Sequence, residues 1–129
     1  MSSRANDWLR QAVRDLEQAE DSRTAERHEW ACFAAHQGAE KAAKGLHPFC
    51  GQEAWGHVVA KLLTELPDRV AAAAPLVNKA KVLDNFYVPA RDPNGHPAGA
   101  PFEHYGPLQS EEAIRHAREI VEFCRSRMA

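Results

Sequence analysis

The chain has 129 residues, of which 44 % are hydrophobic and 26 % are charged, and this composition excludes a disordered chain. The length predicts one domain over residues 1–129. The formal net charge of −2 excludes a general attraction to nucleic acid, so recognition of phosphate would depend on a local cluster of charges.

The chain contains no apolar run long enough to cross a membrane, and its first residues lack the apolar stretch of a secretory signal. We therefore expect a cytoplasmic protein without membrane contact. Cys32, Cys50 and Cys124 form no CxxC pair. We interpret them as reduced thiols rather than as a disulfide framework.

The first two predicted elements are helices. Residues 6–20 carry apolar side chains at helical spacing, with Asn6 or Asp7 as the N-cap. Residues 28–46 form a stronger and more central helix. Gly38 lies in its interior, where glycine costs about 1 kcal/mol relative to alanine, and this predicts close packing against a neighbouring helix.

Three further helices follow. The third is predicted over 56–66, where Pro67 ends it, and the fourth over 76–87. The last begins at Ser110, its predicted N-cap, and keeps an apolar stripe to Cys124. The fold class is therefore all-α: an antiparallel up-and-down bundle of four to five helices with a long Pro/Gly-rich loop before the last helix.

That loop, residues 88–109, contains five prolines and three glycines. A structureless segment of this length in a small domain is usually either functional or disordered. The prolines stiffen it, and Phe102 and Tyr105 are candidate anchors. We favour an ordered functional loop.

Arg91 and His96 lie in this loop. A guanidinium presents a planar fork of donors that suits a phosphate. An imidazole both takes and gives a proton near neutral pH, so the pair is a minimal set for cleaving a phosphodiester without a metal. The alternative is two solvated polar residues on a surface loop.

Four segments in chain order resemble the HEPN (higher eukaryotes and prokaryotes nucleotide-binding) family. Residues 31–46, ACFAAHQGAEKAAKGL, resemble its second helix, and the Gly-His turn at 55–57 resembles the start of its third. Residues 83–91, LDNFYVPAR, resemble its Leu-Asp-x-x-Tyr-Ile-Pro-x-Arg motif, and 110–123 its last helix. The resemblance covers nearly the whole chain.

The resemblance implies a helical bundle that forms a homodimer. Catalytic members are metal-independent endoribonucleases whose Arg-x(4–6)-His motifs meet at the dimer interface, and many are toxins paired with a minimal nucleotidyltransferase as antitoxin. Arg91 and His96 match the motif, and Asp92 matches the polar residue that often follows its arginine. The alternative is a non-catalytic subunit that binds a nucleotide or substrate for a partner nucleotidyltransferase.

Other residues are candidates for a supporting or phosphate-binding role. On the second helix, Lys41 and Lys44 would contact phosphate while Glu40 orients Arg91. The alternative is that Glu40 and Lys44 form an exposed i,i+4 ion pair of about 0.2–0.5 kcal/mol.

Just before the loop, Asp84 would hold Arg91, and Tyr87 would stack on a base or cover the site. The alternative is a polar residue at a helix end and a core aromatic.

The sequence predicts neither a metal nor a cofactor. His28-Glu29-Trp30-Ala31-Cys32 lacks the second histidine of HExxH. His96, Glu103 and His104 share a loop, but their spacing alone is weak evidence for a metal site. Other histidines are expected at the surface or at helix ends: His36, His47 and His116.

Overall fold

A computed structural model describes residues 4–129; residues 1–3, part of the N-terminal stretch discussed above, lie outside it. The described chain is all-helical, which confirms the predicted fold class. Its α-helices are α1 (Arg4–Thr24), α2 (His28–Phe49), α3 (Val59–Thr64), α4 (Ala74–Asp84) and α5 (Pro107–Arg127). Short 3₁₀ turns are η1 (Asp68–Val70), η2 (Pro93–Gly95) and η3 (Pro101–Glu103).

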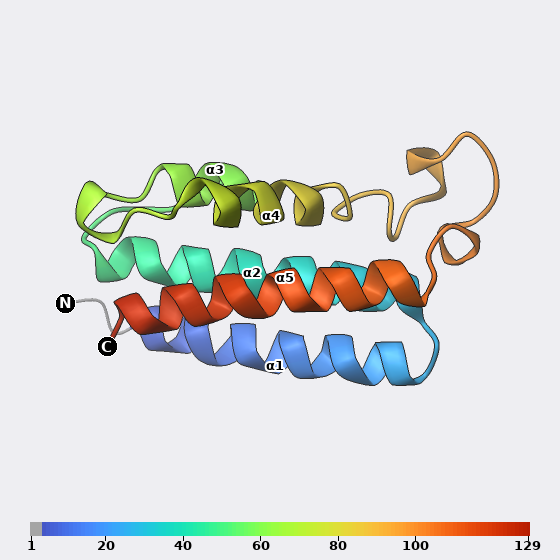
Figure 1. Cartoon of the computed structure of the whole chain (residues 1–129), viewed down its shortest axis with the longest axis horizontal. Helices are drawn as coiled ribbons and strands as arrows, with labels where there is room; N and C mark the ends of the chain where they lie inside the picture. The colour runs from blue at the N-terminus through green and yellow to red at the C-terminus, as the bar shows by residue number, and fades with distance from the viewer. Residues whose placement is uncertain (1–3) are drawn as a thin grey trace.

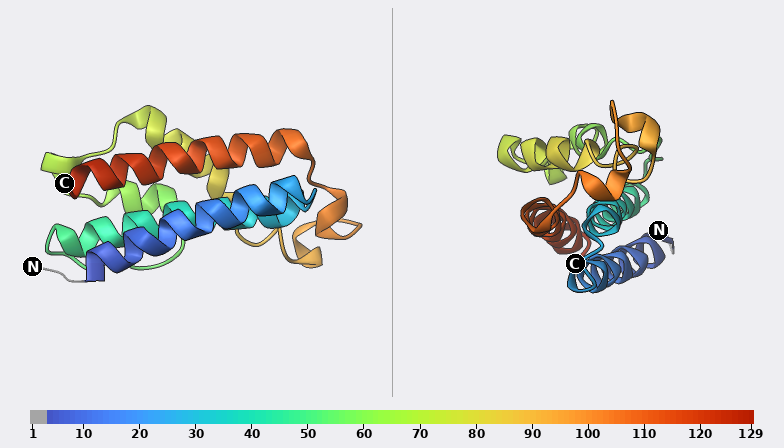
Figure 2. Two further views of the ribbon diagram at one scale, coloured as in Figure 1. Left: turned by 90° about the horizontal axis from the view of Figure 1, so that it is seen from below. Right: turned by 90° about the vertical axis from the view of Figure 1, so that its right-hand side faces the viewer.

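The long helices α1, α2 and α5 run side by side, and α3 and α4 cover one face of α2 and α5 (Figures 1 and 2). In Figure 1 the chain runs from left to right along α1, back along α2, from left to right again along α4, and back along α5. The segment between α4 and α5 lies at one end of the bundle, opposite the C-terminus (Figure 1). None of the described helices is long and apolar enough to cross a membrane.

Close packing of α1 on α2 depends on glycines, as Gly38 predicted. A Cβ at Gly38 would lie 3.2 Å from the Ala12 carbonyl oxygen, and one at Gly45 would lie 2.9 Å from the Trp8 Cβ. Buried alanines such as Ala12 and Ala19 complete this contact. The small side chains bring α2 into the centre of the bundle, where it packs against each of the other α-helices.

The structure corrects several predicted helix starts. Asn6 and Asp7 lie inside α1, which includes residues from Arg4 onward, so neither is its N-cap. Helix α5 begins at Pro107 with Gly106 as its N-cap, so Ser110 is not the cap. Proline suits the first turn because its fixed φ is helical and its missing N–H needs no partner. Ser110 is instead buried, and its hydroxyl hydrogen-bonds to His28 Nδ1 at 2.8 Å.

The structure corrects the expected exposure of three histidines. His36, His47 and His116 are all buried, although His47 does lie in the last turn of α2, at a helix end as expected. Two of them bond to other elements: His47 Nε2 to the Leu62 carbonyl at 2.8 Å, and His36 Nε2 to the His57 carbonyl at 3.1 Å. Each links α2 to the α3 region, because an imidazole combines a flat apolar body with a polar atom for a buried carbonyl.

Candidate functional site

The loop between α4 and α5 has a defined path held by its own polar groups. Asp92 Oδ1 accepts from the Asn94 backbone N–H at 2.9 Å and starts η2. Glu103, the last residue of η3, accepts from the Ala100 N–H at 2.9 Å and so caps the start of that turn. The structure therefore supports an ordered loop, in which Asp92 is a turn-capping residue.

Arg91 is exposed but held in place. Its Nε donates to the Tyr87 carbonyl at 2.9 Å, and its guanidinium carbon lies 4.8 Å from the Phe33 ring centroid and 4.7 Å from that of Tyr87. Cation–π contact and flat stacking both favour this arrangement. Within residues 4–129 no acid pairs with Arg91, so its terminal nitrogens remain available to an anion.

His96 is fixed from two sides. Its Nε2 donates to the Pro89 carbonyl at 2.6 Å, and its ring stacks on His104 with centroids 4.0 Å apart and planes 2° apart. The His96 Nδ1 has no hydrogen-bond partner within the described part of the chain. This nitrogen is the one available to a ligand.

A close backbone approach at Gly95 makes the His96 contact possible. A Cβ at Gly95 would lie 2.7 Å from the Pro89 Cα, closer than side chains tolerate. Because Arg91 binds the carbonyl of Tyr87 and His96 binds that of Pro89, one short turn of backbone orients both side chains.

Tyr87 is the second aromatic wall of the site. Its ring stacks on His57, with centroids 4.8 Å apart and planes 17° apart, and lies 5.1 Å from the His36 ring. It is half-buried rather than a core aromatic. Tyr87 therefore connects Arg91 to α2 and to the start of α3.

Glu40 supports this wall indirectly. It is only 4 % exposed, and its carboxylate accepts from His57 Nδ1 at 3.1 Å and pairs with Lys44 Nζ at 3.2 Å. The expected i,i+4 pair of Glu40 and Lys44 exists, although Glu40 is buried rather than exposed. Glu40 contacts Arg91 only through the chain His57, Tyr87, Arg91.

Two expected site residues are held by other partners. Asp84 does not hold Arg91: its two carboxylate oxygens accept from the backbone N–H groups of Val59 (2.7 Å) and Ala60 (3.0 Å) and so cap α3. Lys41 Nζ lies 2.6 Å from Asp15 Oδ2 and ties α2 to α1. Both side chains have structural partners in place of the arginine or a phosphate.

Sequence reasoning did not place three residues around the site: Phe33, His57 and His104. It named Tyr105 only as a candidate loop anchor. The Gly-His turn was noted, but nothing in the linear order indicated that its imidazole stacks on Tyr87. Tyr105 packs edge-on against His96, with centroids 5.8 Å apart. Burial, with a smaller contribution from Cys32, raises the pKa of Tyr105, so its phenol stays protonated at neutral pH.

Within residues 4–129, no three or more His, Cys, Asp or Glu side chains are grouped to hold a metal ion. The side chains that the structure brings together at the site are a guanidinium, two stacked imidazoles and aromatic rings. Such groups bind an anionic phosphate and move protons.

Comparisons with known proteins agree with this fold. A model of the HEPN domain matches residues 5–127. TT1696 from Thermus thermophilus is 47 % identical, with a TM-score of 0.95 and coverage of 98 % of this chain and 99 % of that chain. ST0689, an archaeal HEPN homologue, is 38 % identical, with a TM-score of 0.84 and coverage of 99 % and 100 %.

An HEPN domain protein from Thermotoga maritima, tm0613, is 31 % identical, with a TM-score of 0.75 and coverage of 93 % of this chain and 95 % of that chain. No curated protein matches the chain.

Proposed function

Because the chain belongs to the HEPN domain family, we propose that it is a metal-independent endoribonuclease of the HEPN type that acts as a homodimer. The observation that carries this proposal is the joint anchoring of Arg91 and His96 on the backbone of residues 87–89, which leaves the guanidinium terminus and the His96 Nδ1 available. In this proposal the protein is the toxin of a toxin–antitoxin pair.

The proposed reaction uses the substrate's own nucleophile. His96 Nδ1 removes the proton of a ribose 2′-hydroxyl, the 2′-oxygen bonds to the adjacent phosphorus, and the bond to the 5′-oxygen breaks. The leaving oxygen takes a proton from an imidazolium or from water. Arg91 stabilises the charge that develops on the non-bridging oxygens. The products are a 2′,3′-cyclic phosphate and a 5′-hydroxyl.

Pairing of two copies would strengthen the site. One chain carries a net charge of −2 and contributes a single Arg91. A two-fold axis near the loop would bring two such arginines to one cleft and double the local positive charge.

A second function is supported by a different observation. Arg91 lies on the rings of Phe33 and Tyr87, and such a surface binds a nucleotide without any proton transfer. In this case the chain is a non-catalytic subunit that holds a nucleotide or substrate for a partner nucleotidyltransferase. Binding would need Arg91, whereas only cleavage would need the proton transfer at His96.

One experiment separates the two functions. A structured RNA is incubated with the protein in EDTA, and fragments are analysed by mass spectrometry for 2′,3′-cyclic phosphate ends. The endoribonuclease predicts cleavage that Arg91→Ala and His96→Ala abolish and that Arg14→Ala, an exposed control, retains. RNA binding without cleavage in the wild type supports the binding subunit. Cleavage that persists in His96→Ala contradicts the proposed mechanism.

A further inference from the structure

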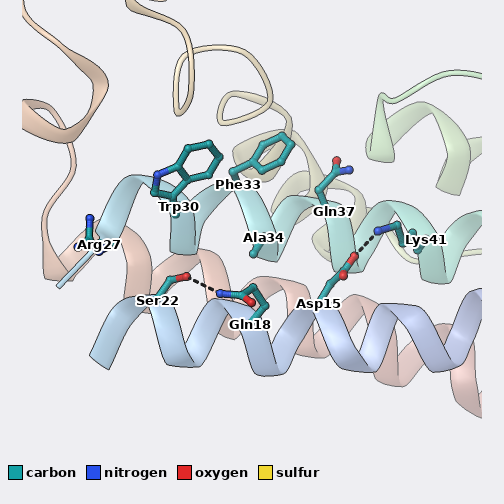
Figure 3. A pocket seen from close by; sticks show the side chains of 9 residues that line it. All are labelled: Asp15, Gln18, Ser22, Arg27, Trp30, Phe33, Ala34, Gln37 and Lys41. Atoms are coloured by element: carbon teal, nitrogen blue, oxygen red, sulfur yellow. Dashed lines mark hydrogen bonds and ion pairs between the residues drawn. The ribbon is translucent and has the colours of Figure 1, made fainter. Parts of the chain in front are cut away.

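An open groove of about 440 Å³ runs along α1 and α2 next to the candidate site (Figure 3). Phe33 lines this groove and is also the ring on which Arg91 stacks. Phe33 is therefore a side chain shared by the groove and by the Arg91 contact. Its volume lies within the range of about 300–1,000 Å³ that small-molecule sites occupy.

The groove presents aromatic surface. Trp30 and Phe33 project from successive turns of α2 (Figure 3), with ring centroids 6.1 Å apart and planes at 80°. The Trp30 side chain is large and hydrophobic, yet it is 47 % exposed. An indole face open to solvent beside a second ring is a stacking surface for another flat aromatic group.

Two carboxamides supply hydrogen-bonding groups. Gln18 Nε2 donates to the Ser22 hydroxyl at 3.1 Å (Figure 3), which leaves the Gln18 carbonyl oxygen without a partner among residues 4–129. The Gln37 Oε1 lies 3.2 Å from His36 Nδ1 and hydrogen-bonds to it, which leaves the Gln37 amide nitrogen without a partner among residues 4–129. Paired donors and acceptors of this kind match the polar edge of a nucleobase.

The two ends of the groove differ in charge. Arg27 lines it near Trp30, and the described residues offer no acid within ion-pair distance of its guanidinium. Farther along, Asp15 and Lys41 form an ion pair, so this end of the groove offers a phosphate no unpaired cation among the described lining residues. A phosphate would therefore lie near Arg91 and Arg27 rather than near Asp15.

We propose that this groove, which we call the base groove, binds the nucleobase of the nucleotide or RNA whose phosphate Arg91 holds. The inference rests on the proposed function for the phosphate, but its own evidence is the aromatic and carboxamide lining. Trp30 stacks on the base, and Gln18 and Gln37 contact its edge.

The test compares ligands that share or lack the base. Calorimetric titrations use adenosine and uridine 5′-monophosphates, the two nucleosides, and ribose 5-phosphate. The base groove predicts that each nucleotide binds more tightly than ribose 5-phosphate, and that Trp30→Ala removes this gain, roughly a five- to hundredfold loss. Affinity for ribose 5-phosphate should stay unchanged in Trp30→Ala, and Trp55→Ala, at an exposed tryptophan outside the groove, should bind as wild type.

The outcomes separate the two proposals. Equal affinity for nucleotides and ribose 5-phosphate, with dependence on Arg91, overturns the base groove and leaves the phosphate site intact. A base-dependent gain that Trp30→Ala removes but Arg91→Ala does not affect supports the base groove and contradicts the phosphate site. Absence of binding for every ligand overturns the base groove, whereas the RNA cleavage assay still tests the enzyme. A change of oligomeric mass in Trp30→Ala identifies the groove as an interface between copies and also overturns it.

Discussion

Arg91 shows how a flexible cation is oriented without an acid. One Nε hydrogen bond and two aromatic faces hold it, so the entropy lost when it binds a phosphate is reduced in advance. A carboxylate partner would hold it as firmly but would neutralise its charge. The aromatic wall of Phe33 and Tyr87 avoids this, because rings restrain the guanidinium while its net charge remains.

The Tyr87 ring should matter more than its hydroxyl. Tyr87→Phe keeps the stacking on His57 and Arg91, so RNA binding and cleavage should remain within about twofold of wild type. Tyr87→Ala removes a cation–π contact of about 0.5–1 kcal/mol at an exposed site and one of the two rings that restrain the guanidinium, so affinity should fall by roughly two- to fivefold. Fluorescence anisotropy with a short labelled RNA measures the affinity of both variants. An equally large loss of affinity in Tyr87→Phe would contradict the role of the ring.

Gly95 should be needed for the position of His96. In Gly95→Ala the new Cβ would meet the Pro89 Cα at 2.7 Å, so η2 must shift and the His96–Pro89 hydrogen bond must lengthen. Because the loop is exposed, the midpoint of thermal unfolding should change by only a few degrees while RNA cleavage falls at least tenfold. Asn94→Ala, next in sequence and also exposed, is the control; equal activity in both variants would rule out the packing argument.

The three thiols should differ in reactivity. Burial raises the pKa of Cys32 and Cys124 to about 12, whereas Cys50 is only partly buried. The thiolate is the reacting form, so iodoacetamide at pH 8 should modify Cys50 alone in the folded protein and all three thiols in denaturant. Intact-mass measurement counts the adducts, and rapid modification of Cys32 in the folded state would contradict its burial.

At the scale of elements, alanine substitutions at the two glycines of the α1–α2 contact should have different effects on the free energy of unfolding. Alanine is favoured over glycine in a helix by about 1 kcal/mol, but overpacking costs about 1–3 kcal/mol. At Gly45 the new methyl would lie 2.9 Å from the Trp8 Cβ and 3.0 Å from the Ala5 carbonyl. Gly45→Ala should therefore lower the free energy of unfolding by about 1–2 kcal/mol.

Gly38→Ala is the matched comparison, because its nearest contacts lie at 3.2–3.3 Å and include the flexible end of Leu16. We expect a change within about 0.5 kcal/mol, since the gain in helix propensity offsets the tighter contact. Urea denaturation followed by circular dichroism measures both variants. If Gly45→Ala is as stable as the wild type, the prediction is wrong, because α1 and α2 would then move apart slightly without a decrease in the free energy of unfolding.

Helix boundaries were the least predictable part of the elements. The apolar spacing indicated a third helix over 56–66, yet α3 spans only Val59–Thr64. Its start is decided by Asp84, which is distant in sequence and accepts from the first backbone N–H groups of the helix. Local spacing cannot reveal a cap that arrives from another helix.

At the scale of the whole molecule, the proposed homodimer is testable by mass. Light scattering coupled to gel filtration should give twice the chain mass of 14.4 kDa at micromolar concentration. A dimer whose arginines meet in one cleft should also bind RNA with a steep salt dependence. A monomer under these conditions would contradict the two-fold site but not the binding of a nucleotide by one chain.

The linear pattern was sufficient for the class of the fold and for the presence of its helices, because helix formation follows local apolar spacing and proline positions. It also indicated Arg91 and His96, since their chemistry belongs to the residue types themselves. Only the tertiary structure decided their surroundings: Asp84 and Lys41 have partners in distant segments, while Phe33 and His57 approach from other elements. The physical reason is that ion pairs, caps and ring stacking depend on distance in space, which folding sets for residues far apart in the chain.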